Sequence, residues 1–343
     1  MKIGQATIKD IAKELGVSSS TVSRALKDYP GISEETKRKV KEVAERLNYR
    51  PNAVALSLRK SRSFTIGVII PEVVHFFFST VISGIEEVAQ ARGYNVILTQ
   101  SNESVDREKS SIEAMLSNQI DGFLVCFTKE TKDFDHFSKL MDFGFPIVFF
   151  DRIPKLEGAV SVAVDDYKGG YEAVSHLIEQ GFQNIAHLSG PKSLKISQNR
   201  ERGYRDALYN HGMQVNEEFI RECPTGTTEE AFSVAMDLLE NSKSKPDAFF
   251  ASNDMAAVGA MRAARKLGLR IPDEMGIVGF SNWQFCSMLE PSLSSVAQPG
   301  FKMGSESATL LLDLIEKKIE GSSIKDPIIL NTELLVRNSS VRR

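Results

Sequence analysis

The chain has 343 residues, and its net charge of −3 is uneven: residues 1–63 hold 14 Lys and Arg against 7 Asp and Glu, and the remainder holds 28 against 38. This length predicts two or three folding units, and the charge split predicts that only the basic head meets a polyanion. The three isolated cysteines exclude a disulfide framework and a CxxC metal site. The N-terminus has no signal-peptide core and no run of about 18 apolar residues occurs, so we expect a cytoplasmic protein that is neither exported nor membrane-spanning.

The basic head predicts three short helices. An apolar stripe at i, i+3, i+4 and i+7 begins at Ile8, and Gly16 stands where that helix would stop. Ser18 can cap a second helix and Ser33 a third, which Pro51 prevents from continuing. Two short helices joined by a three-residue turn form a helix-turn-helix.

The exposed face of the second predicted helix carries Ser19, Ser20, Thr21, Ser23 and Arg24, which are small and uncharged or cationic. Such a face can approach phosphates and base edges without repulsion. The alternative is an ordinary three-helix bundle whose charges only solvate it. The helix spacing and the charge asymmetry favour DNA binding.

The segments TIKDIAKELGVSSSTVSRAL and SEETKRKVKEVAERLNYRPNAVALSL closely resemble the N-terminal domain of the lactose-repressor/galactose-repressor (LacI/GalR) family of bacterial transcription regulators. The resemblance covers residues 6–58 and implies two sets of DNA contacts. Bases would be read by Ser19, Ser20 and Arg24, and phosphates would be contacted by Thr7, Thr21 and Ser23. Arg24 is the strongest base-reading candidate, because a guanidinium can pair bidentately with guanine.

The connector RPNAVALSLRKSRS encloses an apolar half-helix in a basic segment. It is too short to be stable alone. Members of the family form this helix only on the operator. Asn52 can cap this short helix. The resemblance implies that Val54 contacts the same helix of the second subunit, that Leu58 wedges into the minor groove of the DNA and that Ala55 makes the adjacent groove contact.

Short apolar strands alternate with helical segments throughout the body. One series of strands is predicted at 65–70, 94–98, 121–126 and 146–150, and a second at 161–164, 184–189, 247–251 and 276–280. This alternation is typical of parallel sheets covered by helices on both faces. The sequence thus predicts an α/β fold with two doubly wound lobes.

Enzyme motifs do not occur in the body. It has no GxGxxG after the first strand, no P-loop, no GxSxG elbow and no HExxH, and its five histidines are scattered. We therefore expect no catalytic residues, metal or cofactor. An α/β enzyme and a transport-type solute-binding protein remain as alternatives. The second should have a signal peptide and lack the basic head.

Polar residues follow four predicted strands, where ligands of open α/β sheets bind. The four groups are Asp151-Arg152, Asp165-Asp166, Ser252-Asn253-Asp254 and Ser281-Asn282-Trp283. Asp166 and either Ser252 or Asn253 have a second explanation as helix N-caps. Asp165 and Asp254 are less easily explained as caps, so we expect them to accept hydrogen bonds from a ligand.

Aromatic and cationic residues complete the expected ligand site. Phe76, Phe77 and Phe78 cannot all face one core, so at least one should face the cleft and stack on a sugar or base. Packing under a loop or at a subunit contact is the alternative. Arg200 is a further candidate, although a single arginine is more often in a solvated ion pair.

Motifs such as VDDYKGGYEA, HLSGP, RGYRDAL and PSLSSVAQP resemble the periplasmic-binding-protein-like effector domain of the same family. The resemblance places in the effector pocket Phe77, Phe78, Asp165, Arg200, Asp254 and the residue after GF. That residue is often Asp in the family, but here it is Ser281. Leu194 aligns with the arginine that purine-binding relatives use for the base, and their stacking aromatic aligns near Gly226. Trp283 is the candidate replacement stacking face. A purine effector is thus disfavoured. The family resemblance, more than the residue chemistry, implies a sugar or sugar derivative as the effector, with a nucleobase or nucleoside corepressor as the alternative.

The same resemblance implies that the body crosses between its lobes three times. The first lobe would comprise about 64–163 and 295–325, and the second 164–294 and 326–343. A helix at about 304–320 would return to the first lobe.

The sequence therefore predicts a helix-turn-helix domain at 1–50, a hinge helix and linker at 51–63 and an effector-binding and dimerisation domain at 64–343. The expected function is that of an effector-controlled regulator, a repressor, that binds double-stranded DNA. One head makes too few phosphate contacts for tight binding, so a homodimer on a pseudo-palindromic operator is expected. The effector would either release DNA or promote its binding.

Overall fold

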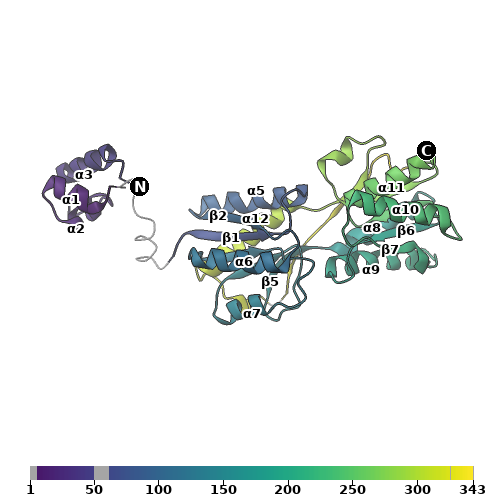
Figure 1. Cartoon of the computed structure of the whole chain (residues 1–343), viewed down its shortest axis with the longest axis horizontal. Helices are drawn as coiled ribbons and strands as arrows, with labels where there is room; N and C mark the ends of the chain where they lie inside the picture. The colour runs from purple at the N-terminus through teal and green to yellow at the C-terminus, as the bar shows by residue number, and fades with distance from the viewer. Residues whose placement is uncertain (1–5, 50–61, 325, 343) are drawn as a thin grey trace. The chain divides into compact units, whose positions relative to one another are not determined.

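The computed structural model describes residues 6–49, 62–324 and 326–342. The chain divides into two compact units, Met1–Ser63 and Phe64–Arg343, which we call the head and the body (Figure 1). The hinge positions predicted from the sequence lie outside the described residues, and these are Asn52, Val54, Ala55 and Leu58.

The head contains the three predicted helices, α1 (Ile8–Leu15), α2 (Ser19–Ala25) and α3 (Glu34–Arg46). Each begins where a side chain can satisfy free backbone N–H groups: Ser18 accepts from the N–H of Thr21, and Ser33 from that of Thr36. Gly16 ends α1 in the left-handed conformation, with φ of 65°. The apolar stripes meet in one small core formed by Ile11, Ala12, Val22, Ala25, Val40, Val43 and Ala44.

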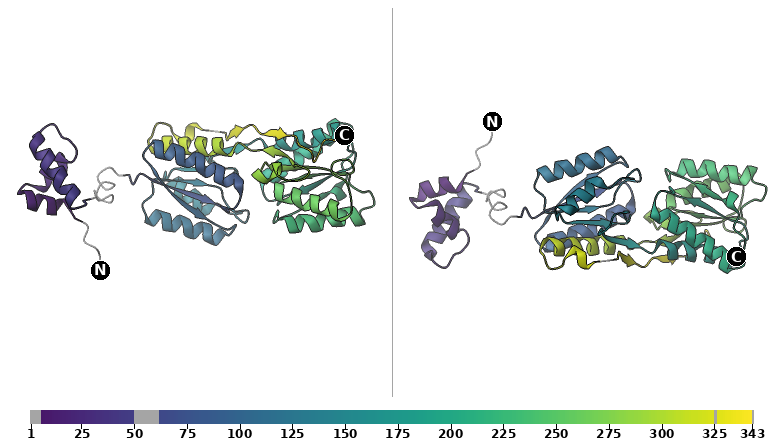
Figure 2. Two further views of the ribbon diagram at one scale, coloured as in Figure 1. Left: turned by 90° about the horizontal axis from the view of Figure 1, so that it is seen from above. Right: turned by 90° about the horizontal axis from the view of Figure 1, so that it is seen from below.

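The first lobe of the body is a six-stranded parallel sheet in the order β11-β5-β4-β3-β1-β2. Its strands are β1 (Thr65–Ile70), β2 (Asn95–Gln100), β3 (Gly122–Val125), β4 (Ile147–Phe150), β5 (Val160–Val164) and β11 (Ile328–Leu330). Its helices are α5 (Phe76–Ala91), α6 (Val105–Ser117), α7 (Asp135–Asp142) and α12 (Gly300–Ile315). Cores on both faces of the sheet, one under α5 and α12 and one under α6 and α7, make the lobe doubly wound (Figure 2).

The second lobe repeats this plan in the order β12-β10-β9-β8-β6-β7, with β12 antiparallel to β10 at the edge. Its strands are β6 (Ile185–Ser189), β7 (Ile220–Glu222), β8 (Ala248–Ala251), β9 (Gly276–Ser281), β10 (Ser294–Ala297) and β12 (Glu333–Leu335). One face is covered by α8 (Asp166–Glu179) and α9 (Lys195–Asn210), and the other by α10 (Thr228–Asn241) and α11 (Asp254–Lys266). Short 3₁₀ helices lie at Glu217–Phe219 and Gln284–Ser287 in this lobe, and another lies at Gly321–Ser323 next to the first lobe. The predicted α/β fold with two doubly wound sheets is confirmed.

Two of the expected crossings between the lobes lie later than predicted. Residues 294–297 form β10 and pair with β9 in the second sheet, so the chain leaves that lobe after Ala297. Residues 328–330 form β11 and pair with β5, so the last crossing follows Leu330. The returning helix, α12, begins at Gly300 and ends at Ile315. Strands of three or four residues have too little pattern to show which sheet they join.

Close packing of α5 against α12 requires glycine at two positions. A Cβ on Gly84 would meet the backbone oxygen of Phe301, and a Cβ on Gly304 would meet that of Val81. The two helices can therefore approach closely only because neither position has a side chain. Among the described residues, no helix combines the length and the apolar character needed to cross a membrane.

Candidate functional site

Five of the six predicted DNA-contacting residues lie on α2 of the head. Ser19, Ser20 and Arg24 are exposed on α2, and Thr21 and Ser23 are half-buried on it. The Arg24 guanidinium lies 5.7 Å from the centre of the Tyr29 ring and forms no ion pair with the described residues. Its charge is therefore available to an anionic or hydrogen-bonding partner.

Thr7, the predicted phosphate contact on α1, is exposed at the N-cap of that helix. Both its backbone N–H and its hydroxyl donate to the carboxylate of Asp10, at 2.8 and 2.7 Å. On α2 the hydroxyls of Ser20 and Thr21 lie 2.7 and 2.8 Å from that of Ser18. The polar groups at both helix starts are thus held in fixed positions next to the exposed face.

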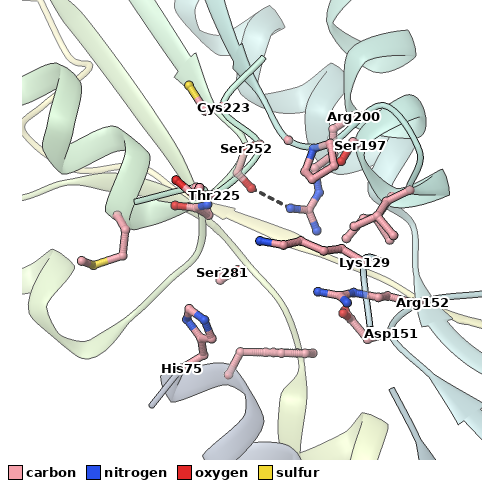
Figure 3. Close-up of a pocket in the computed structure, with 18 of the residues that line it drawn as sticks. His75, Lys129, Asp151, Arg152, Ser197, Arg200, Cys223, Thr225, Ser252 and Ser281 are labelled. Atoms are coloured by element: carbon pink, nitrogen blue, oxygen red, sulfur yellow. Dashed lines mark hydrogen bonds between the residues drawn. The ribbon is translucent and has the colours of Figure 1, made fainter. Parts of the chain in front are cut away.

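A cavity of about 170 Å³ lies between the two lobes at the carboxyl ends of their strands (Figure 3). We call it the effector cleft, after the ligand expected there from the sequence. Seven of the predicted effector-binding residues line it: Phe77, Phe78, Asp151, Arg200, Asn253, Ser281 and Trp283. They come from segments that are far apart in the sequence. Parallel strands that end at facing edges bring them together.

The first lobe contributes buried charge to the effector cleft. Asp151 follows β4 with a φ of 64° and is buried, and this burial raises the pKa of its carboxyl. Next to it, Arg152 forms a bidentate ion pair with Glu103, with N–O distances of 2.8 and 3.0 Å, and donates to the carbonyl oxygen of Phe127. The Arg152 guanidinium is therefore held rigidly at the cleft surface.

The second lobe contributes Arg200, which the sequence left as either a ligand contact or a solvated ion pair. Its Nε and Nη2 lie 2.8 and 2.7 Å from the buried carboxylate of Asp166, and Nη1 donates to the carbonyl oxygen of Ser252. The guanidinium also lies 3.7 Å from the centre of the Phe280 ring. Burial raises the pKa of Asp166 to about 6, although the nearby arginine opposes that shift. Arg200 is thus in a buried ion pair, not a solvated one, and still reaches the cleft.

Aromatic rings from both lobes form the apolar part of the cleft. Phe77 and Phe78 are buried at its edge on α5, whereas Phe76 lies outside its lining. Trp283, in the second lobe, lies 5.3 Å from His75 of the first lobe, measured between ring centres in an edge-to-face arrangement. This contact spans the two lobes across the cleft.

Two of the predicted ligand acceptors are already used by the protein, and neither lines the cleft. Asp165, not Asp166, is the N-cap of α8, and it accepts from the N–H of Lys168 at 2.9 Å. Asp254 is fully buried and accepts from the N–H of Trp283 and the hydroxyl of Ser295, at 2.8 and 2.6 Å. Both carboxylates thus have a structural role in their own lobe, and the ligand contact expected of them stays a prediction.

Asn253 is the N-cap of α11, as the sequence suggested, since it accepts from the N–H of Ala256 at 2.8 Å. Its side chain also lines the cleft. The sequence reasoning did not select Glu103, Lys129 or Gln298, which line the cleft as well. Glu103 and Lys129 follow β2 and β3, so the same strand-end signal would have found them.

A helix-turn-helix head joined to a two-lobed α/β body with a ligand cleft defines the class of effector-controlled DNA-binding regulators. Residues 7–52 match the family described as "Bacterial regulatory proteins, lacI family". Residues 63–332 match "Periplasmic binding proteins and sugar binding domain of LacI family". The chain therefore belongs to the LacI family, and it is a DNA-binding transcription regulator, not an enzyme.

Several relatives match almost end to end. The chain is 35% identical to catabolite control protein A of Priestia megaterium over 319 residues, which is 93% of this chain and 95% of that protein. It superimposes on a lac repressor dimer bound to operator and an anti-inducer with a TM-score of 0.85 and 26% identity, over 98% of this chain and 100% of the other. A complex of the regulator CelR with cellobiose gives a TM-score of 0.73 and 27% identity, over 98% and 100%.

Proposed function

We propose that this regulator is a repressor whose affinity for its operator is set by a carbohydrate bound in the effector cleft. The observation that carries the proposal is the composition of that cleft. Aromatic faces from Phe77 and Trp283 lie in the same cavity as the polar groups of Asp151, Asn253 and Ser281. A sugar needs this combination, because its ring has apolar faces and a rim of hydroxyls.

The cleft composition disfavours a purine effector. Leu194 and Gly226 both line the cavity. By the family resemblance, Leu194 aligns with an arginine of purine-binding relatives, and their stacking aromatic aligns near Gly226. A Cβ on Gly226 would lie 2.6 Å from the side-chain nitrogen of Asn253, so little space remains there for a stacking ring. The residues that do line the cleft suit hydroxyl groups better than a flat base.

A dimer follows from the need for two DNA-binding heads. One helix-turn-helix reads a single half-site, and a symmetric pair reads a pseudo-palindrome. The body offers an apolar surface for such pairing at the first-lobe edge strand β2 and the nearby loop after β1. The exposed apolar residues there are Val73, Val74, Ile97 and Leu98.

The proposal is tested with the full-length protein in two steps. A thermal-shift screen against neutral sugars, sugar phosphates and nucleosides identifies ligands, and each hit is then added to an operator-binding titration. We expect at least one carbohydrate to raise the melting temperature and to change operator affinity. A nucleoside as the only hit, or sugar binding that leaves operator affinity unchanged, would contradict the proposal.

The DNA-binding surface is tested in the same titration. Operator affinity should fall with salt at a log-log slope of roughly −0.9 for each phosphate contacted. Arg24→Ala should cost about 1–3 kcal/mol on the operator and much less on non-specific DNA. Arg38→Ala, an exposed arginine on α3, is the matched control. Equal losses for both variants would remove Arg24 from the base-reading set.

A further inference from the structure

A second cavity, of about 310 Å³, borders the effector cleft, and we call it the basic cavity. Six cationic side chains line it: Lys129, Lys132, Arg152, Lys155, Lys192 and Lys195. The other lining residues are apolar or neutral, and none of them is Asp or Glu. This concentration of positive charge lies in a body whose overall charge is negative.

The cations come from the ends of three strands in two lobes. Lys129 and Lys132 follow β3 and Arg152 and Lys155 follow β4, all in the first lobe. Lys192 and Lys195 follow β6 in the second lobe, and Lys195 is the first residue of α9. The start of α9 is docked on the first lobe, because Leu194 and Ile196 pack against the core under α6 and α7. The basic cavity is therefore built jointly by both lobes.

Most of these charges have no partner within the described part of the protein. Lys132, Lys155, Lys192 and Lys195 are exposed and form no ion pair there. The Nζ of Lys129 donates only to the carbonyl oxygen of Pro224, at 3.4 Å. Arg152 is paired with Glu103, yet its buried Nε has no hydrogen-bond partner. Like charges gathered at one cavity repel each other, and a bound anion would relieve that repulsion.

The start of α9 adds to the positive potential. Its N-cap is Leu194, which has no capping side chain, and its first turn contains no acidic residue. The free N–H groups and the helix dipole both favour an anion at such a position. A lysine there, Lys195, is unfavourable unless an anion binds next to it.

We propose that the basic cavity binds the phosphate group of a phosphorylated carbohydrate effector whose sugar ring lies in the effector cleft. This inference rests on the proposed function. The two cavities share Lys129, Arg152, Leu194 and Ile196, so one ligand can reach both. The larger basic cavity has room for a phosphate and several waters, since each water occupies about 30 Å³.

Such a ligand would act on the relative position of the lobes. Its phosphate would lie between Lys132 and Lys155 of the first lobe and Lys192 and Lys195 of the second. A ligand that contacts both lobes binds the closed arrangement more tightly than an open one, and it shifts the population by that difference. The basic cavity would thereby couple the charge of the effector to the state of the regulator.

The test is isothermal titration calorimetry on the full-length protein. The probes are glucose 6-phosphate with glucose, ribose 5-phosphate with ribose, and inorganic pyrophosphate. We expect at least one phosphate ester to bind at least tenfold more tightly than its parent sugar, and pyrophosphate to bind at low salt. The double variant Lys192→Gln/Lys195→Gln should lower the affinity for the ester and for pyrophosphate at least tenfold and leave the affinity for the neutral sugar unchanged.

Two further variants keep the test specific. Lys243→Gln/Lys317→Gln removes two exposed lysines that line neither cavity and should bind like the wild type. Lys155→Gln probes the opposite lobe and should weaken the same ligands. Esters that bind no better than their sugars, or an affinity that the Lys192/Lys195 variant does not change, overturn the inference.

The outcomes also separate this inference from the proposed function. A neutral sugar that alters operator affinity while no ester binds more tightly would support the repressor proposal and overturn the phosphate assignment. Pyrophosphate binding that depends on Lys192 and Lys195, in a protein whose operator affinity no carbohydrate alters, would support an anion site and contradict the carbohydrate-controlled repressor.

Discussion

Single residues in the body show how burial sets charge. His187 is fully buried on β6 and stacks between Tyr204 and Phe250, with ring centres 5.3 and 4.8 Å apart. Its Nδ1 lies 3.0 Å from the carbonyl oxygen of Phe250, and its Nε2 has no partner within the described residues. Burial lowers the pKa of His187 to about 4, so the imidazole is neutral in the folded protein at pH 7.

This lowered pKa predicts a loss of stability in acid. His187 binds a proton near pH 6.5 in the unfolded chain but only near pH 4 in the folded chain. The free energy of unfolding therefore decreases as the pH falls between these values. Between pH 7.5 and 4.5 the loss should be roughly 2–3 kcal/mol. Denaturant titrations of the wild type and of His187→Gln at both pH values measure it.

The comparison with the variant is needed because carboxyls whose pKa is raised by burial, those of Asp151, Asp166 and Asp254, act in the opposite direction. Burial raises the pKa of Asp166 and of Asp254 to about 6, so both favour the folded state as pH falls through that value. Their effect is common to both proteins, and the difference isolates His187. If both proteins lose equal stability, His187 is not the titrating group.

At the scale of elements, the pair α5 and α12 depends on glycine at the contact. Gly304→Ala would place a Cβ against the backbone of Val81 and force the helices apart. The substitution also gains roughly 1 kcal/mol of helix propensity, which is smaller than the overpacking cost of about 1–3 kcal/mol plus the lost contacts. We expect a net loss of about 2 kcal/mol in the free energy of unfolding.

Denaturant unfolding measures this loss, and Thr309→Ala is the matched control. Thr309 is exposed on the same helix, and its hydroxyl donates to the carbonyl oxygen of Ser305. The control should change stability by less than about 0.5 kcal/mol. A Gly304→Ala protein as stable as the wild type would show that the two helices can separate without cost.

At the scale of the whole body, Trp283 reports on the relation between the lobes. It is the only tryptophan, and its ring meets His75 across the effector cleft. A ligand that enters the cleft must alter the surroundings of this ring. We therefore expect saturating effector to change the tryptophan emission, with a midpoint equal to the calorimetric affinity.

The reporter has a direct control. In Trp283→Phe the emission change should disappear, because no other tryptophan exists. Binding itself should persist with reduced affinity if the ring only stacks on the ligand. Unchanged wild-type emission at saturation would place the ligand away from Trp283 and contradict the cleft as its site.

Much of the architecture could be predicted from the sequence because it rests on local patterns. The apolar stripe from Ile8 and the caps Ser18 and Ser33 define the head helices, and each of these signals involves only a few neighbouring residues. Apolar runs define the longer strands in the same way, for example β1 at Thr65–Ile70. These signals depend only on neighbouring residues, so no long-range information is needed.

The tertiary structure decided what local patterns do not contain. A shift of one residue in the start of α8 makes Asp165 the cap and leaves Asp166 to pair with Arg200, a partner 34 residues away. Likewise, the lysines of the basic cavity converge because β3 and β4 are neighbours in one sheet and because the start of α9, after β6, is docked on that lobe. The sequence by itself determined the elements, the two-lobed class and the strand ends that could bind a ligand. Which carboxylates remain free and which cations converge was decided by contacts between distant segments, and only the folded chain makes those contacts.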